Sequence, residues 1–457
     1  MNLCQLFIAS LVLLSSAVSA GGTDKPRPFA NDICLPSQLW MLDGVQNEIY
    51  VQPFLKRWRP YDDFVRFSMK GNCPFYRRLG HVATIDKPVD GAVLNVELVN
   101  GDEFETLKTL NPILRVGKPG VGEKEVVAQV VGDSYTHGSF FWDALVKEKY
   151  VPNLRLVGLR RPFEVKQYHE GRGGWTLASY FKVPTGERFS YHGFMHPSDG
   201  RYWGDVTFWK MVWRCVRKTQ PQGFSPTYEC EYFGDAVQRF DERTGYLKAP
   251  KAGDFQYDRE KGGFVRWNGT AWTPVDERKI SWSFDYGKYL AMWELEKPKF
   301  LFEMLGVNDF RGGLNADYSE WSRQLEVFKT SYLKAVPDGK FAICIPCSTF
   351  GSVDNFVGDF VPKQNAAMWR FRNWLIKTYD KREKDGYYLV DTALGVDSDY
   401  GYLSATNRPM AKPFAKYSGK GLLDVQYGNP HPYNSYPTMG IPLAAFIQYW
   451  RDRGERN

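Results

Sequence analysis

The chain has 457 residues, of which 43% are hydrophobic and 16% aromatic, so it can bury a sizeable core over two to three domains. Its formal net charge of +7 at pH 7 is spread along the sequence, and no block of Lys and Arg resembles a nucleic-acid-binding arm. The composition therefore argues against global disorder and against a nucleic-acid partner.

Residues 1–20 have the features of a secretory signal peptide. The apolar stretch from Leu6 to Leu14 is too short to span a bilayer, and the small residues from Ala17 to Ala20 suit cleavage. No Lys or Arg precedes the apolar stretch, which departs from the usual pattern. No later stretch is long and apolar enough to span a membrane, so we expect a secreted or periplasmic protein without stable membrane insertion.

Six of the seven cysteines remain after removal of the signal peptide, and an even number in an exported protein favours disulfides. Proximity in the sequence suggests the pairs Cys34–Cys73, Cys215–Cys230 and Cys344–Cys347. The last pair also has the spacing of a redox or zinc motif, but no second close Cys or His pair completes a zinc site. We therefore expect structural disulfides and no metal or cofactor.

Residues 30–124 predict an N-terminal β-sandwich domain. Short runs that alternate apolar and polar residues, such as 48–51 and 92–99, are separated by turn signals such as Asn100-Gly101-Asp102. A Gly- and Pro-rich linker over 117–122 ends this domain. It could bind carbohydrate or act as a structural module packed on the next domain, and we favour the structural role.

Residues 125–457 alternate strands and helices, which predicts a parallel sheet covered by helices on both faces. Strands are expected at 125–130, 154–159, 300–305, 341–345 and 387–391, and helices at 139–147, 316–336, 365–384 and 442–450. Residues 185–290 interrupt this pattern as a β-rich insertion with many aromatic residues. Those rings could stack on sugars or could simply form a small core.

The tripeptide Gly132-Asp133-Ser134 lies between a valine-rich strand and a helix. A serine at such a junction occupies the position where α/β enzymes hold a nucleophile, and the helix N-terminus offers N–H groups to a developing oxyanion. Taken alone, the motif is also typical of a plain turn with Ser134 as the helix N-cap.

Three later stretches follow in order: Glu-Gly-Arg-Gly-Gly-Trp-Thr at 170–176, Gly-Val-Asn-Asp at 306–309 and Asn-Pro-His-Pro at 429–432. Together with the serine motif, they resemble the four blocks of the SGNH (GDSL-type) hydrolase superfamily over residues 125–455. The second block is most similar to the carbohydrate esterases of that superfamily. The resemblance implies a flavodoxin-like three-layer α/β fold, here with an N-terminal β-sandwich and a β-rich insertion.

The resemblance also assigns roles to individual residues. Ser134 is expected as the nucleophile, and Ser134, Gly174 and Asn308 are expected to form the oxyanion hole. A serine hydroxyl needs an adjacent base, and His431 matches the family's base. The family usually has an aspartate three residues before that histidine, where this chain has Gly428. Either Ser134 and His431 act as a dyad, or Asp424 reaches His431 through a folded-back loop.

These features predict an exported serine esterase that removes O-acyl groups, chiefly O-acetyl groups, from a carbohydrate. A lipase or general acylhydrolase is one alternative, and a catalytically inactive carbohydrate-binding protein that keeps the fold is another. The many Trp and Tyr residues, without a long exposed apolar stretch, favour a sugar over a lipid. His192 and His196 are spaced like a metal pair, but no third ligand is evident.

Overall fold

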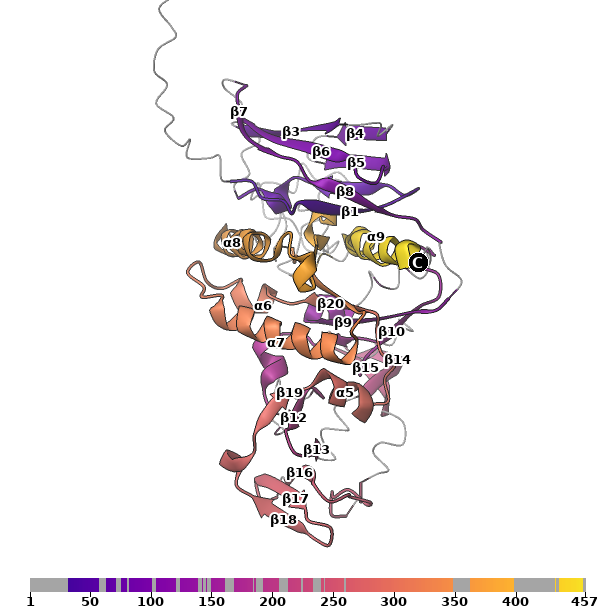
Figure 1. Ribbon diagram of the computed structural model, residues 1–457, viewed down its shortest axis with the longest axis vertical. Helices are drawn as coiled ribbons and strands as arrows, with labels where there is room; N and C mark the ends of the chain where they lie inside the picture. The colour runs from indigo at the N-terminus through magenta and orange to yellow at the C-terminus, as the bar shows by residue number, and fades with distance from the viewer. Residues whose placement is uncertain are drawn as a thin grey trace, which may run out of the picture.

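The computed structural model arranges the chain in layers along its long axis (Figure 1). Sheets near the N-terminus lie at one end, helices and a parallel sheet form the middle, and most strands of the insertion lie toward the other end. The structure describes residues 32–56, 63–70, 75–79, 82–100, 104–120, 124–138, 142, 145, 149–160, 168–183, 185, 192–204, 213–222, 225–232, 240–241, 243–258, 260–347, 362–397, 432 and 435–454.

The N-terminal segment forms two β-sheets around one hydrophobic cluster, which includes Ile49, Phe54 and Leu94. One sheet has the order β1-β8-β6-β3, with β7 also paired to β6, and the other has the order β2-β5-β4. The strands are β1 (Gln38–Leu42), β2 (Asn47–Tyr50), β3 (Asp63–Lys70), β4 (Phe75–Leu79), β5 (Val82–Lys87), β6 (Val93–Asn100), β7 (Thr106–Leu110) and β8 (Ile113–Gly117). The segment expected to form a β-sandwich thus contains two sheets that share one apolar interior.

The central sheet has the strand order β10-β9-β20-β21-β22, and every one of these pairings is parallel. The strands are β9 (Val126–Gly132), β10 (Leu154–Val157), β20 (Phe300–Met304), β21 (Lys340–Cys344) and β22 (Tyr387–Val390), and the short β11 (Glu170–Gly171) extends the edge of β9. In chain order within this sheet the sequence of strands is 2-1-3-4-5, the doubly wound order of flavodoxin. The predicted α/β architecture with a parallel sheet is confirmed.

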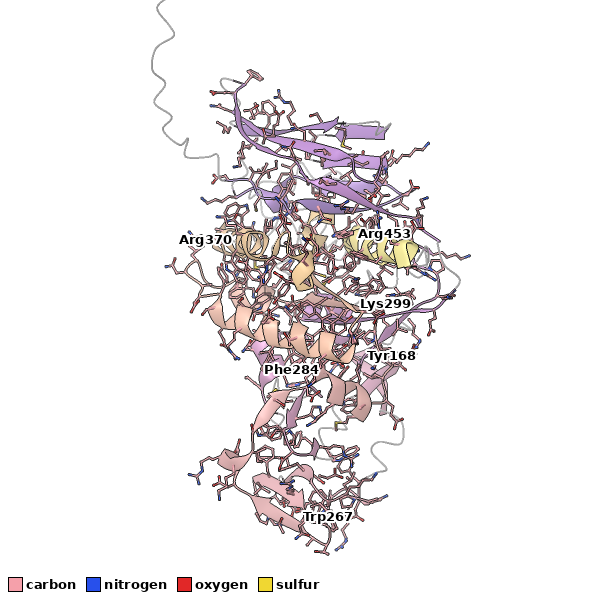
Figure 2. All side chains as sticks on the ribbon, viewed as in Figure 1. Tyr168, Trp267, Phe284, Lys299, Arg370 and Arg453 are labelled. Carbon is pink, nitrogen blue, oxygen red and sulfur yellow. The ribbon has the colours of Figure 1, made fainter. Side chains whose placement is uncertain are left out.

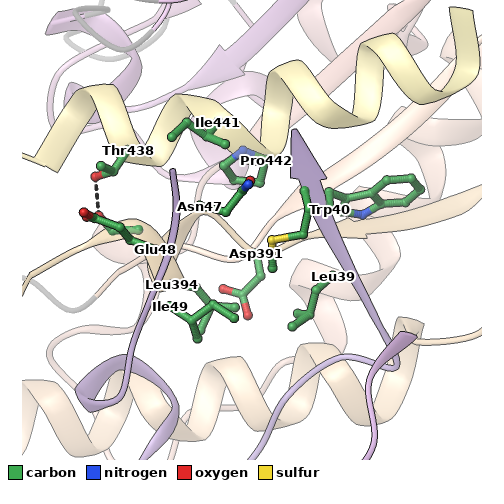
Figure 3. Close-up of a pocket in the computed structure, with 12 residues that line it drawn as sticks. Leu39, Trp40, Asn47, Glu48, Ile49, Asp391, Leu394, Thr438, Ile441 and Pro442 are labelled. Carbon is green, nitrogen blue, oxygen red and sulfur yellow. Dashed lines mark hydrogen bonds between the residues drawn. The ribbon is translucent and has the colours of Figure 1, made fainter. Parts of the chain in front are cut away.

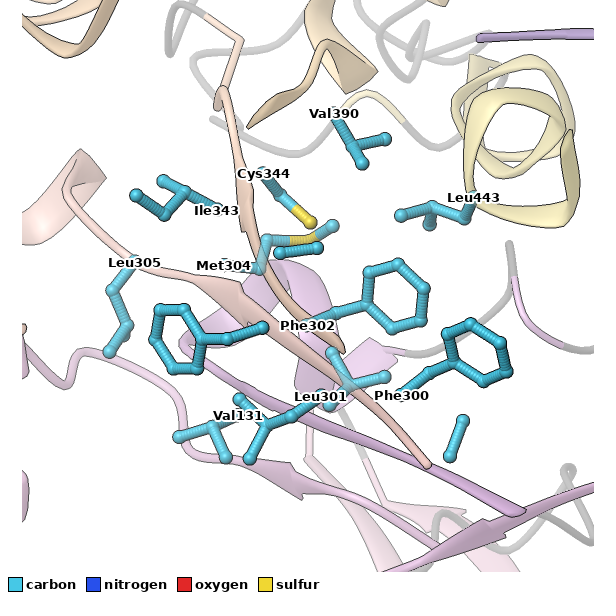
Figure 4. Packing of buried hydrophobic residues seen from close by; sticks show 14 of the residues in the cluster. Val131, Phe300, Leu301, Phe302, Met304, Leu305, Ile343, Cys344, Val390 and Leu443 are labelled. Atoms are coloured by element: carbon cyan, nitrogen blue, oxygen red, sulfur yellow. The ribbon is translucent and has the colours of Figure 1, made fainter. Parts of the chain in front are cut away.

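Helices cover both faces of this sheet. Phe300 and Phe302 of β20 contact Phe446 of α9 (Tyr436–Gly454) at ring-centroid distances of 6.0 and 5.7 Å. Figure 4 shows these two phenylalanines on the side of β20 that faces Leu443 of α9. Phe341 of β21 points to the opposite face, where Phe328 of α7 (Ser319–Ala335) lies 5.5 Å from it. The remaining helical segments are α2 (Ser134–Gly138), α5 (Tyr286–Met292), α6 (Val307–Phe310), α8 (Pro362–Tyr379), and the 3₁₀ turns η1 (Gln52–Phe54), η2 (Leu177–Phe181), η4 (Glu277–Lys279), η5 (Glu383–Asp385) and η6 (Thr392–Gly395).

The insertion is rich in β-structure and ends in helix α5. It contains a four-stranded sheet of order β13-β16-β17-β18, the pair β12–β19 and the hairpin β14–β15. Trp267, on β17, lies far along the long axis from Arg453, on α9 (Figure 2). The strands are β12 (Met195–Pro197), β13 (Arg201–Tyr202), β14 (Trp213–Gln222), β15 (Ser225–Tyr232), β16 (Asp254–Asp258), β17 (Gly263–Trp267), β18 (Trp272–Val275) and β19 (Trp282–Phe284).

Two of the three expected disulfides are wrong. Cys34 and Cys344 carry buried thiols that form no disulfide. Burial raises the pKa of the Cys34 thiol to about 11, so it stays protonated. Cys344, at the end of strand β21, is also fully buried, and burial raises the pKa of its thiol well above the usual value. The register of β14 and β15 does pair the backbone of Cys215 with that of Cys230, so this third bridge stays a prediction.

A buried arginine of the central domain, held by an ion pair, attaches the N-terminal segment to that domain. Arg372 of α8 binds both carboxylate oxygens of Asp391, with 2.9 Å between Nη1 and Oδ1, and its Nε donates to the Cys34 carbonyl at 3.3 Å. Both side chains of the pair are almost fully buried. Nearby, the indole N–H of Trp40 donates to the Leu389 carbonyl at 2.7 Å. These contacts support a structural role for the N-terminal segment.

A small cavity lies at the same junction, where β1, β2, η6 and α9 meet (Figure 3). Its lining includes Asn47, Asp391 and Pro442, and none of the expected catalytic residues contributes to it. The cavity therefore belongs to the packing between the N-terminal segment and the central domain.

Replacing Arg372 by methionine is expected to lower the free energy of unfolding by about 3–5 kcal/mol, because Asp391 would be left as an unpaired buried carboxyl. Denaturant unfolding followed by fluorescence measures this loss. Arg382→Met is the matched control, since the Arg382–Asp385 pair lies on the surface and should contribute less than about 1 kcal/mol. Equal losses in the two variants would contradict the role given to the buried pair.

Candidate active site

Ser134 lies at the switch point of the parallel sheet. Strand β10 pairs with one edge of β9 and β20 with the other, so the chain connections leave β9 and β20 in opposite directions. Ligands of open α/β sheets bind in the crevice at the carboxyl ends of such neighbouring strands. Ser134 lies two residues after the end of β9, and Asn308 lies four residues after the end of β20. The topology thus brings two expected catalytic residues to one crevice.

Asp133 connects these two strand ends. Its side chain is 1% exposed; Oδ1 accepts the N–H of Tyr135 at 3.0 Å, and Oδ2 accepts from Asn308 Nδ2 at 3.3 Å. Burial raises the pKa of the Asp133 carboxyl to about 7, since desolvation outweighs the hydrogen bond from Tyr135. This carboxyl is therefore partly protonated at neutral pH.

Asn308 binds residues from the first and second sequence blocks. Besides contacting Asp133, its Nδ2 donates to the Trp175 carbonyl at 3.0 Å. Asn308 is not the N-cap of α6: that position is held by Gly306, whose N–H donates to Asp309 Oδ2 at 3.1 Å. The side chain of Asn308 is therefore available for tertiary contacts, and the structure brings the first three motifs together around it.

The glycines of the second block form a tight turn beside Ser134. The Trp175 N–H donates to the Arg172 carbonyl at 3.1 Å, and Gly174 has a φ of +79°. These features fit a type II turn, whose third residue needs a positive φ and therefore glycine. A Cβ atom on Gly173 would lie 3.9 Å from the Cβ of Ser134, so the turn faces the serine. The turn's own hydrogen bond does not use the N–H of Gly174, which can serve a ligand.

His431 and Asp424 both lie outside the described residues, so the base and its acid partner remain expectations from the sequence. The described chain resumes at Pro432 and at Ser435, just before α9. The structure therefore places Ser134, Gly174 and Asn308 and tests neither His431 nor Asp424.

Three other histidines are held as neutral side chains. His169 is fully buried; its Nδ1 accepts the Gly171 N–H at 2.8 Å, and burial lowers its pKa well below the usual value. Burial also lowers the pKa of His192 to about 3 and that of His196 to about 4. The rings of His192 and His196 each contact a backbone carbonyl at 2.8 Å. Within the described part of the chain, no group of three or more His, Cys, Asp or Glu could hold a metal ion.

The sequence analysis did not identify several buried ionisable side chains around the site. Asp309 accepts the Leu177 N–H at 3.1 Å, and burial raises its pKa to about 6. Burial also raises the pKa of Glu303 on β20 well above its usual range, and Asp309 and Asp133 raise it further. Glu170 and Arg172 form a buried ion pair at 2.8 Å. A detectable signal was the spacing of Glu170 and Arg172, which puts both side chains on one face of an extended segment.

The raised pKa of Asp133 predicts a pH-dependent stability. The folded-state pKa of about 7 exceeds the unfolded value of about 3.9, so the contribution is complete below about pH 4 and is lost as the pH rises through 7. The loss should be about 4 kcal/mol, since each unit of pKa difference corresponds to about 1.4 kcal/mol. Between pH 4 and 8, the free energy of unfolding of wild type should fall by this amount more than that of Asp133→Asn. Parallel curves would show that Asp133 ionises normally.

Comparisons with known proteins add little to this geometry. No family model matches the chain, and no curated protein matches it. A possible lipase from Chitinophaga pinensis DSM 2588 aligns with a TM-score of 0.31 and 10% identity, over 72% of this chain and 99% of that chain. A peptidoglycan O-acetylesterase aligns with a TM-score of 0.26 and 12% identity, over 73% of this chain and 93% of that chain. Both likenesses are too weak to carry a functional argument.

No helix in the described part of the chain is long and apolar enough to cross a membrane. The expected signal peptide at residues 1–20 lies outside the described residues.

Proposed function

We propose that this protein is an exported serine esterase that removes O-acyl groups, chiefly O-acetyl groups, from a carbohydrate. The observation that carries the proposal is the meeting of Ser134, the glycine turn at 172–175 and Asn308 at the switch point of a parallel sheet. This arrangement combines a candidate nucleophile with N–H donors on one side of it, which is what acyl transfer requires.

In this proposal, Ser134 Oγ attacks the ester carbonyl carbon while His431 takes the hydroxyl proton. The backbone N–H groups of Ser134 and Gly174 and the Asn308 amide stabilise the negative oxygen of the tetrahedral intermediate. The intermediate collapses to an acyl-enzyme, and the sugar hydroxyl leaves with the proton from His431. Water, activated by His431, then attacks the acyl-enzyme and releases the carboxylic acid.

Asn308 has to give up one existing hydrogen bond to serve the oxyanion. An amide nitrogen has two hydrogens, and both have acceptors here: Asp133 Oδ2 at 3.3 Å and the Trp175 carbonyl at 3.0 Å. The longer contact, to Asp133, is the weaker one, so it is the bond that yields. The Trp175 carbonyl then keeps the amide oriented during the reaction.

One substitution, Asp424→Asn, tests whether Asp424 is the acid partner of His431. Under the dyad mechanism, Asp424→Asn should leave kcat nearly unchanged. Under the triad mechanism it should lower kcat by about 10⁴-fold, because the imidazole loses the carboxylate that fixes its tautomer. Steady-state kinetics of the purified variant distinguish the two mechanisms.

Hydrolysis of nitrophenyl esters tests the proposed function. We expect release of nitrophenol from the acetyl ester, a lower kcat/KM for long-chain esters, and acetate release from at least one acetylated polysaccharide. A preference for long chains would point to a lipase or general acylhydrolase. Binding of a polysaccharide without hydrolysis of any ester would identify an inactive carbohydrate-binding protein and would refute the proposal.

A further inference from the structure

Glu170 is a fully buried carboxyl in β11, and the glycine turn begins two residues after it. Strand β11 pairs with the end of β9, with Glu170 opposite Val131 and Gly171 opposite Gly132. Glu170 Oε1 accepts the Leu159 N–H at 2.7 Å. This carboxyl therefore lies behind the strand end that carries the nucleophile.

Two side chains complete the hydrogen bonding of Glu170. Oε1 also accepts the hydroxyl of Tyr289 at 2.7 Å, and Oε2 accepts from Arg172 Nη2 at 2.8 Å. Among the described residues, three donors and no acceptor thus face the Glu170 carboxyl. A charged, acceptor-only group fits this site, whereas an amide would turn a donor toward at least one of these donors.

Arg172 transmits the position of Glu170 to the turn. Its backbone N–H donates to the Gly132 carbonyl at 3.0 Å, and its own carbonyl closes the turn by accepting the Trp175 N–H at 3.1 Å. Its guanidinium lies 5.0 Å from the centre of the Trp175 ring. A shift of Arg172 therefore moves both ends of the turn that holds Gly174.

Tyr289 belongs to α5, the helix that ends the long insertion, so the insertion reaches the site through this hydroxyl. Tyr286, on the same helix, donates to Gln129 Oε1, and Gln129 Nε2 donates to the Tyr289 hydroxyl at 3.0 Å. Both tyrosines are fully buried. The Tyr289 hydroxyl thus bonds to both Gln129 and Glu170, whereas the Tyr286 hydroxyl bonds to Gln129.

We infer that Glu170, anchored by Tyr289 of the insertion, is a positioning residue that fixes the glycine turn and, through the Trp175 carbonyl, the Asn308 amide. The inference rests on the proposed esterase function, because the turn and the amide are its oxyanion donors. The insertion then contributes to catalysis through a buried tyrosine as well as through any loops it places near substrate.

Tyr289→Phe and Tyr286→Phe form a matched pair for testing this inference. Each removes one buried hydroxyl from α5 that bonds to Gln129, so both should lower the melting temperature by similar amounts. Tyr289→Phe should also lower kcat by about 10-fold with KM unchanged, because small displacements of catalytic groups cost up to about 100-fold. Tyr286→Phe should keep kcat within about 2-fold. Glu170→Gln should lower kcat more than Tyr289→Phe does, because it changes the carboxylate itself and not one of its hydrogen-bond donors.

Equal kcat losses in the two tyrosine variants, or losses that track their stability, would overturn the inference. Wild type and Ser134→Ala are assayed beside them, and equal activity in those two would refute the esterase function instead. Amide hydrogen exchange at residues 171–175 is then the independent readout. It should be faster in Tyr289→Phe than in Tyr286→Phe, and equal exchange would refute the positioning role whatever the activity.

Discussion

Replacing Ser134 by alanine is expected to lower kcat for ester hydrolysis by roughly 10⁵- to 10⁶-fold, because it removes the hydroxyl that is proposed to form the acyl-enzyme. The fold should persist, since Ser134 is a half-buried first residue of α2 whose side chain is small. Steady-state kinetics with the nitrophenyl acetate substrate measure the loss. A serine-reactive phosphonate should label the wild type and leave the variant unlabelled.

Thr136→Val is the matched control for Ser134→Ala. Thr136 lies on the same short helix, is fully buried, and its hydroxyl has no hydrogen-bond partner among the described residues. Valine has the same shape, so activity should stay within about 3-fold of wild type, as for a substitution that removes no native interaction. Near-normal turnover in Ser134→Ala would remove Ser134 from the role of nucleophile.

Replacing Asn308 by alanine is expected to lower kcat by roughly 100- to 1000-fold, as the loss of a single oxyanion donor does in known serine hydrolases. KM should change little, because the amide bonds most strongly to the negative oxygen of the transition state. Initial rates over a range of acetyl-ester concentrations separate the two constants. A sharp rise in KM with kcat retained would instead make Asn308 a substrate-binding residue.

Asn308 also holds the Trp175 carbonyl, so part of the loss in Asn308→Ala could come from a displaced turn. Near-UV circular dichroism of the buried Trp175 ring reports such a displacement. An unchanged spectrum with the full kcat loss assigns the effect to the missing donor. A spectrum like that of Glu170→Gln assigns it to the turn.

The strands of the central sheet could be located from the sequence because buried parallel strands are continuous apolar runs. The expected strands at 300–305, 341–345 and 387–391 agree within one residue with β20, β21 and β22. The continuous burial of β9 follows the same rule. The agreement reflects a local signal, since each run alone is too apolar to lie on a surface.

The start of α9 was predicted wrongly. The sequence predicted a helix over 442–450, but α9 begins at Tyr436 and contains Pro442. The preceding turn is held by packing instead: a Cβ atom on Gly395 would lie 2.7 Å from the Thr438 carbonyl oxygen. The Thr438 hydroxyl also donates to the Gly395 carbonyl. A tertiary contact with η6 therefore extends the helix beyond its sequence signal.

The sequence by itself determined the alternation of strands and helices, the junction that holds Ser134 and the order of the motifs, because these depend on periodicity and turn chemistry within short windows. Only the tertiary structure decided which buried polar side chains, far apart in the sequence, form hydrogen bonds with one another. Asn308 meets Asp133 across 175 residues, and Tyr289 meets Glu170 across 119. A buried polar group is stable only with a partner, and that partner is set by which strands and helices become neighbours in the fold.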